Sequence, residues 1–149
     1  MTKKKSSVIS FEGFSFQYRA QKKPTLTGIN LNIYPGEKVL IAGPSGSGKS
    51  TLAGCINGLN PFSNPGESTG KLIVDGVDAM HSSIFELSAH VGTVLQDPDG
   101  QFIGLTVGED IAFALENGCT PQDKMHEITK HAAELVGIKN HLDYAPHEL

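Results

Sequence analysis

The stretch of residues 43–51 constrains the possible folds of this chain more than any other part of the sequence. It reads Gly-Pro-Ser-Gly-Ser-Gly-Lys-Ser-Thr, in which a glycine is followed by four residues and then by Gly-Lys-Ser. Gly43, Gly46 and Gly48 carry no Cβ, so the backbone can curl through positive φ and turn its N–H groups inward. Such N–H groups form a nest for phosphate oxygens, and the pattern therefore predicts a phosphate-binding P-loop.

The last residues of the P-loop supply a charge and a metal ligand. Lys49 places a positive charge beside the outer phosphates, and the Ser50 hydroxyl can ligate the Mg²⁺ that bridges them. A helix that begins here adds the positive end of its dipole. The predicted cofactor-binding residues of the loop are Gly43, Pro44, Ser45, Gly46, Ser47, Gly48, Lys49, Ser50 and Thr51.

The segments on either side of the P-loop support the motif. Residues 38–42 are a short apolar run that favours a buried parallel strand. Residues 50–57 are typical of a helix, and Gly58 suits its end. A flexible Gly/Ser turn is the alternative interpretation of the stretch, and it would require neither the strand nor the helix.

Alternating apolar residues predict further strands. In residues 8–18 aromatics recur at every second position after a glycine break, which predicts one strand or two. Residues 26–34 alternate apolar and Asn side chains, as a half-exposed antiparallel strand does. Residues 71–77 predict a strand with an Asp-Gly turn and residues 91–95 an apolar strand, whereas the Pro, Gly, Ser and Asn of residues 60–70 predict a loop.

Helices are predicted mainly in the second half of the chain. Thr106 and Glu109 match a capping box in front of an amphipathic helix. Thr120 is predicted to be the N-cap, and Pro121 the first residue, of a helix that stops at Gly137. The mixture of half-exposed and buried strands with later helices indicates an α/β fold.

Composition limits the partners of the chain. Its 149 residues include 12 Lys and Arg against 16 Asp and Glu, and the net charge of -4 argues against a nucleic-acid-binding surface. The two cysteines, Cys55 and Cys119, are expected to be free thiols. No apolar run approaches the roughly 20 residues of a membrane span, and no signal peptide is visible. We therefore expect a cytosolic protein that reaches a membrane only through a partner.

Tyr18 and Gln96 are candidate site residues whose role the local pattern leaves open. Tyr18 ends an aromatic strand, and it can stack on an adenine ring or serve as a core or edge aromatic. Gln96 follows an apolar segment, and it can ligate Mg²⁺, orient a water by the γ-phosphate or be a surface glutamine. Asp97 and Asp99 lie in a Pro/Gly turn and are interpreted as turn formers.

Several motifs follow one another in a recognisable order, at residues 16–18, 33–38, 43–51, 72–76 and 91–96. This order resembles the ATP-binding subunit of ATP-binding-cassette transporters. The resemblance implies a P-loop core with a parallel sheet flanked by helices, an N-terminal antiparallel β-subdomain and the start of a helical subdomain. It also implies ATP and Mg²⁺ as cofactors.

The P-loop pattern for Lys49 and Ser50, and the resemblance for Tyr18 and Gln96, predict roles for four side chains. Tyr18 would stack on the adenine ring. Lys49 and Gln96 would be the catalytic residues. Ser50 and Gln96 would ligate the metal ion.

The stretch after Gln96 narrows the resemblance. Residues 96–117 are similar to energy-coupling-factor ATPases, which power the import of vitamins and of cobalt or nickel ions. This implies a membrane-embedded transporter subunit as partner, contacted near Phe102, and a second ATPase subunit with which the chain forms a dimer. It further implies a place at the cytoplasmic face of the membrane and no nucleic-acid partner.

The sequence departs from the family pattern at its end. Leu149 matches the first residue of the Leu-Ser-Gly-Gly-Gln signature of the family, and the rest of the signature, the Walker B strand with its catalytic Glu and the switch His do not follow. Residues 1–149 are therefore expected to be a partial nucleotide-binding domain without its C-terminal part. Such a fragment is expected to hydrolyse ATP at a negligible rate, whereas the parent protein would be a working ATPase.

Other functions are open on the sequence alone. A soluble cassette ATPase that acts on ribosomes or DNA would share the motifs, although the acidic composition and the segment after Gln96 disfavour it. A P-loop kinase or GTPase is a further alternative, but a GTPase should carry an Asn-Lys-x-Asp motif, which the sequence lacks. The last alternative is a fragment that binds nucleotide weakly or not at all.

Overall fold

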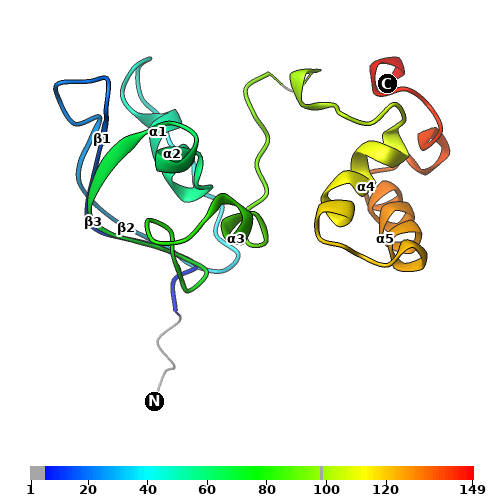
Figure 1. Ribbon diagram of the computed structural model, residues 1–149, viewed down its shortest axis with the longest axis horizontal. Helices are drawn as coiled ribbons and strands as arrows, with labels where there is room; N and C mark the ends of the chain where they lie inside the picture. Colours follow the sequence, from blue (N-terminus) through cyan, green and yellow to red (C-terminus); the bar gives the residue numbers. More distant parts are fainter. Residues whose placement is uncertain (1–5, 98) are drawn as a thin grey trace. The chain divides into compact units, whose positions relative to one another are not determined.

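A computed structural model describes residues 6–97 and 99–149, and the chain divides into two compact units, residues 1–93 and 94–149 (Figure 1). The first unit contains β1 (Ile9–Tyr18), β2 (Leu26–Ile33), α1 (Lys49–Ile56), α2 (Leu59–Phe62), β3 (Gly66–Val74), β4 (Val77–Asp78) and α3 (Ile84–Ser88). The second unit contains the short 3-10 helix η1 (Asp99–Gln101), α4 (Val107–Asn117), α5 (Gln122–Leu135) and the 3-10 helices η2 (Lys139–His141) and η3 (Pro146–Glu148).

The first unit is built on an antiparallel sheet with the strand order β2-β1-β3-β4. Its central strand β1 pairs Ile9 with Ile33 of β2 on one side and with Val74 of β3 on the other. Along β2 the apolar side chains are partly buried and the asparagines between them are exposed. This pattern confirms the predicted half-exposed antiparallel strand. Together with the helices, the sheet confirms the α/β class and its N-terminal antiparallel part.

A bulge at Gly13 places three aromatic side chains on one face of β1. The pairing of β1 with β2 shifts register between Phe11 and Phe14, and Gly13 between them has a φ of +56°. Because side chains alternate along a strand, Phe11 and Phe14 would face opposite sides without the extra residue. With the bulge, Phe11, Phe14 and Phe16 are all buried, none more than 1% exposed. The predicted glycine break is therefore a bulge within one strand.

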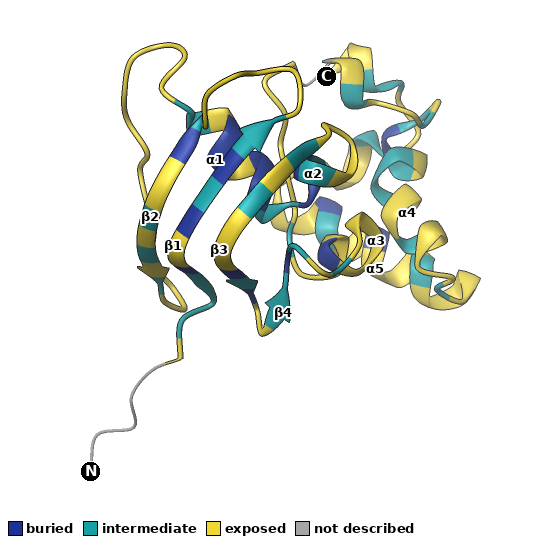
Figure 2. Ribbon diagram, turned by 60° about the vertical axis from the view of Figure 1, so that its left-hand side comes forward, coloured by how far each residue is buried: buried dark blue, intermediate teal, exposed yellow. Residues whose placement is uncertain are grey.

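The core of the first unit lies between this aromatic face and α1 (Figure 2). Leu52 and Cys55 of α1 pack in one cluster with the three phenylalanines and with Leu72 and Val74 of β3. Burying a side chain such as Leu or Phe contributes about 1.5–3 kcal/mol. The helix that follows the P-loop, which the sequence predicted, is thus fixed to the sheet by its apolar side.

Two predicted strands are not formed. Residues 38–42 and 91–95 have no strand pairing, and they leave Leu40 90% and Val94 87% exposed. A strand needs a neighbour that takes up its backbone hydrogen bonds. Among the described residues, every paired strand belongs to the antiparallel sheet. The predictions of a parallel strand at residues 38–42 and of an apolar strand at residues 91–95 are therefore wrong for the structure, since nothing in the described chain pairs with these segments.

Two predicted boundaries also differ from the structure. Residues 60–70 are not all loop, because β3 begins at Gly66, which pairs with Tyr18. The N-cap of α5 is Pro121 rather than Thr120, and its ψ of 140° keeps Pro121 outside the helix. Both errors come from composition, since Gly, Ser and Pro are typical of loops but are also tolerated at strand and helix ends.

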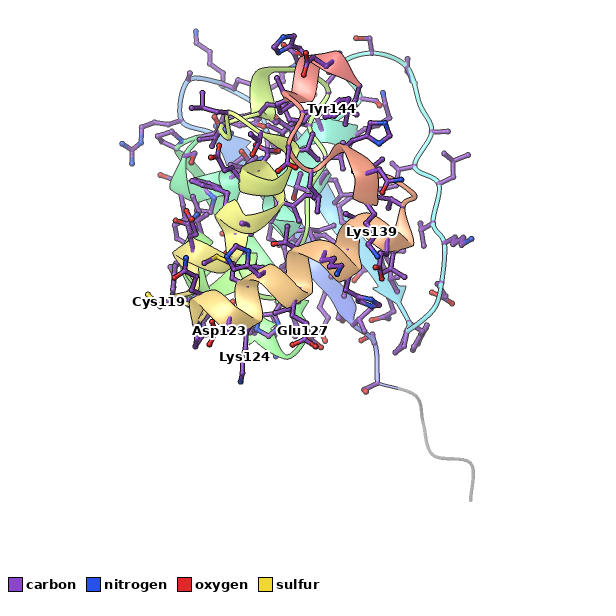
Figure 3. All side chains as sticks on the ribbon, turned by 90° about the vertical axis from the view of Figure 1, so that its right-hand side faces the viewer. Cys119, Asp123, Lys124, Glu127, Lys139 and Tyr144 are labelled. Carbon is purple, nitrogen blue, oxygen red and sulfur yellow. The ribbon has the colours of Figure 1, made fainter. Side chains whose placement is uncertain are left out.

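The second unit is formed by α4, α5 and the segments around them. The predicted capping box of α4 is confirmed: the Glu109 amide donates to Thr106 Oγ1 at 3.2 Å, and the Thr106 amide donates to Glu109 Oε2 at 3.1 Å. Cys119 lies exposed in the turn between α4 and α5 (Figure 3), and it is a free thiol, as is Cys55. In the described part of the chain, every helix falls short of the length and apolar character needed to cross a bilayer.

Candidate functional site

The backbone of the P-loop, residues 43–51, depends on its glycines. Gly46 and Gly48 have φ values of +78° and +93°, a left-handed conformation that other residues adopt only at a cost. Gly43 does not have a positive φ, so the prediction of a left-handed backbone is wrong at this position. A Cβ at Gly43 would lie 2.9 Å from Ser47 Oγ, so an alanine here would need the Ser47 side chain to rotate away.

The start of α1 offers backbone donors to an anion. The N-cap of α1 is Gly48, and no side chain caps the helix here in the described structure. The first hydrogen bond of the helix is donated by the Leu52 amide to Gly48 O, at 2.8 Å. The amides of Lys49, Ser50 and Thr51 therefore have no acceptor within the helix. These N–H groups and the positive end of the helix dipole favour an anion at the P-loop.

Lys49 bends back onto the P-loop. Its Nζ donates to Gly43 O at 2.9 Å and to Pro44 O at 2.8 Å. An ammonium group has three donors, so a third is available to a phosphate oxygen at the same place. The side chain of Ser50 is exposed, which makes its hydroxyl accessible to a metal ion. This donor set fits a polyphosphate with Mg²⁺, because amides and an ammonium suit phosphate oxygens and a hydroxyl suits a hard cation.

Tyr18 is connected to the helix that carries the P-loop. Its hydroxyl lies 3.0 Å from Oγ1 of Thr51, which is only 7% exposed. The Tyr18 ring meets the Phe16 ring edge-on, with the centroids 5.0 Å apart. A shallow hollow in the surface is lined by Tyr18, Ala20, Gln21, Asn64 and Pro65. An aromatic ring beside an open hollow can receive a planar base by stacking.

Asn60 is a residue of this region that sequence reasoning missed. It is 1% exposed, and its Nδ2 donates to Thr51 O at 3.1 Å and to the Tyr18 hydroxyl at 3.3 Å. Its Oδ1 accepts a hydrogen bond from Asn64 Nδ2 at 2.9 Å. The surrounding Asn, Pro and Ser residues predict an exposed loop, so no signal in the sequence marks this asparagine as buried.

Cys55 lies on the buried side of α1, the helix that follows the P-loop. It is 0% exposed, and burial raises the pKa of its thiol to about 12, although a hydrogen bond with Asn60 lowers it in part. The thiol is therefore neutral at physiological pH and adds no negative charge to the helix that would hold an anion.

Gln96 belongs to the second unit, where it is exposed and lies outside any helix or strand. The structure thus brings Tyr18 and the P-loop together within the first unit, whereas the role of Gln96 stays a prediction. Among the described residues, no three His, Cys, Asp or Glu side chains gather in a way that could hold a metal ion. Within the first unit, a magnesium ion at the P-loop would therefore depend on the Ser50 hydroxyl and on the phosphates themselves.

A family model and several known proteins match this chain over most of its length. A family model described as ABC transporter matches residues 26–149. A Clostridium perfringens protein is 57% identical over 145 residues, which are 97% of this chain and 26% of that protein. A Bacillus thuringiensis protein is 58% identical and a Staphylococcus aureus protein 56% identical, each over 142 residues, 95% of this chain and 25% of the relative. All three are provisionally named ABC transporter ATP-binding proteins. The chain spans about a quarter of the length of these relatives.

Proposed function

The chain belongs to the ABC transporter family, and we propose that it binds ATP with Mg²⁺ at residues 43–51 as the nucleotide-binding part of an ATP-driven membrane transporter. The observation that carries the proposal is that unpaired backbone amides and one ammonium group lie together at the start of α1. The amides of Lys49, Ser50 and Thr51 lack helical acceptors, and Nζ of Lys49 is held at the carbonyls of the loop.

Each part of the loop has a role in this proposal. The backbone N–H groups and Lys49 Nζ would hold the outer phosphates, and the Ser50 hydroxyl would ligate Mg²⁺. Bound Mg²⁺ neutralises charge on the phosphate oxygens. Gln96 is proposed as a second metal ligand or as the group that orients the attacking water.

The base of the nucleotide is proposed to stack on Tyr18. The link between the Tyr18 hydroxyl and Thr51 fixes the ring at the same helix that holds the phosphates. Stacking of a base on an aromatic ring contributes about 1–3 kcal/mol, so it would add substantially to the affinity for ATP over that for a phosphate chain alone.

The transporter is proposed to be an importer of the energy-coupling-factor type. This rests on the sequence after Gln96 and on apolar side chains there that the structure leaves exposed, among them Phe102 at 48% and Leu105 at 83%. A membrane-embedded subunit would cover such side chains at the cytoplasmic face of the membrane, and a second ATPase subunit would complete the dimer. We expect little ATP hydrolysis by the 149 residues alone, because their sequence contains no Leu-Ser-Gly-Gly-Gln signature.

Calorimetric titration with Mg-ATP tests nucleotide binding directly. Lys49→Ala should weaken binding by at least tenfold, since charge-assisted hydrogen bonds to phosphate contribute about 1.5–3 kcal/mol. Lys71→Ala is the matched control, because Lys71 is an exposed lysine on β3 and its loss changes the net charge equally. Equal affinity in the two variants, or no heat of binding with the unaltered chain, would contradict the proposal.

A further inference from the structure

A buried asparagine joins the two ends of the proposed nucleotide site. Asn60 lies in α2, and its side chain is almost fully inaccessible to solvent at 1% exposure. A buried amide that lacks hydrogen-bond partners costs about 1–3 kcal/mol, so a side chain of this kind is kept only where its polar atoms are satisfied. The contacts of Asn60 show where those atoms are used.

Both ends of the Asn60 amide are engaged. Nδ2 donates to Thr51 O at 3.1 Å and to the Tyr18 hydroxyl at 3.3 Å, while Oδ1 accepts from Asn64 Nδ2 at 2.9 Å. The Tyr18 oxygen accepts from Asn60, so its own proton is free to be donated to Thr51 Oγ1, 3.0 Å away. Asn60, Thr51 and Tyr18 are thus each hydrogen-bonded to the other two, and Asn60 is also bonded to Asn64.

A glycine in α1 makes room for this arrangement. A Cβ on Gly54 would lie 2.5 Å from Asn60 Nδ2, which is closer than two such atoms can approach. Asn60 therefore sits directly against the backbone of the helix, where its amide can reach the Thr51 carbonyl. The asparagine contacts the helix and the aromatic ring, but none of its contacts is to the proposed phosphate-binding atoms.

We propose that Asn60 is a positioning residue that fixes the Tyr18 ring relative to the P-loop helix and so raises affinity for adenine nucleotides over base-free polyphosphates. The inference rests on the proposed function, since it presumes that Tyr18 receives the base. A ring held in place before binding loses less conformational entropy when the base stacks on it. Asn60 should therefore strengthen the binding of the base and leave the binding of the phosphates almost unchanged.

The test compares Mg-ATP with Mg-tripolyphosphate, which has the phosphates without the base. Asn60→Leu removes the hydrogen bonds of the side chain while keeping much of its volume, and Tyr18→Phe removes only the hydroxyl that Asn60 contacts. Each change should weaken Mg-ATP binding by about three- to tenfold, the equivalent of one hydrogen bond, and change tripolyphosphate binding less than twofold. The double variant should bind ATP about as well as the weaker single variant, because both changes break the same link.

A second variant displaces the Asn60 side chain without replacing it, which keeps the test valid if Asn60→Leu does not fold. Gly54→Ala should displace the Asn60 side chain and give the same selective loss of ATP affinity, although alanine favours the helix. Circular dichroism of each variant checks that the sheet and α1 are retained.

The outcomes separate the two proposals. A selective loss of ATP affinity supports the positioning role. Equal losses for ATP and tripolyphosphate, or additive losses in the double variant, would overturn the positioning role and leave the proposed function standing. An unaltered chain that binds neither ligand would overturn both.

Discussion

Gly48→Ala should destabilise the first unit more than Gly46→Ala, although both changes replace a P-loop glycine of positive φ. The left-handed backbone costs an alanine about 1–2 kcal/mol at either position. A Cβ at Gly46 meets no atom within 4 Å, whereas one at Gly48 would lie 3.0 Å from Leu26 Cδ2 and 3.2 Å from Thr25 O. The end of the leucine side chain can move, but the backbone carbonyl yields less, so crowding adds about 1 kcal/mol.

The free energy of unfolding should therefore fall by about 1–2 kcal/mol in Gly46→Ala and by about 2–3 kcal/mol in Gly48→Ala. The chain has no tryptophan, so urea denaturation is best followed by far-UV circular dichroism. Gly46→Ala is the control for backbone strain, and the difference between the variants measures the contact of the P-loop with the start of β2. Equal losses, or a larger loss in Gly46→Ala, would refute this packing.

Other side chains give predictions that are tested in the same way. Thr106→Ala should lower the stability of the second unit by about 1 kcal/mol through loss of the capping box, and Thr120→Ala should cost much less because Thr120 is not the N-cap of α5; thermal unfolding of both variants checks this. At pH 8 a thiol reagent should modify exposed Cys119 quickly and buried Cys55 only after denaturation. Burial raises the pKa of Cys55 from 9.0 to about 12, so between these pH values the unfolded chain binds fewer protons than the native chain. The free energy of unfolding should therefore fall as the pH rises above about 9. Urea denaturation midpoints measured against pH should show this fall in the unaltered chain and a smaller fall in Cys55→Ala.

Features that depend on neighbouring residues were predicted well from the sequence. The capping box of Thr106 and Glu109 is confirmed because both partners lie within one turn of the chain. The alternation of β2 is confirmed because a strand with one buried face repeats every second residue. The P-loop glycines at 46 and 48 have the predicted positive φ for the same local reason.

Features that depend on distant partners were predicted poorly. The apolar segments 38–42 and 91–95 look like strands, but a strand forms only against a neighbour, and composition says nothing about which neighbour is present. In the same way β3 begins at Gly66 because it pairs with the end of β1, not because its residues favour strands. Asn60 was missed because its burial is decided by Thr51 and Tyr18, which are far away in the sequence.

The most direct test of the account is to follow the backbone amides by heteronuclear NMR during titration with Mg-ATP. The account predicts that the largest shifts occur at the amides of residues 45–51, with a further change at Tyr18, and that the P-loop shifts are lost in Lys49→Ala. Saturating Mg-ATP that leaves these amides unshifted, or that shifts mainly residues elsewhere in the chain, would contradict the central claim that the start of α1 holds the phosphates.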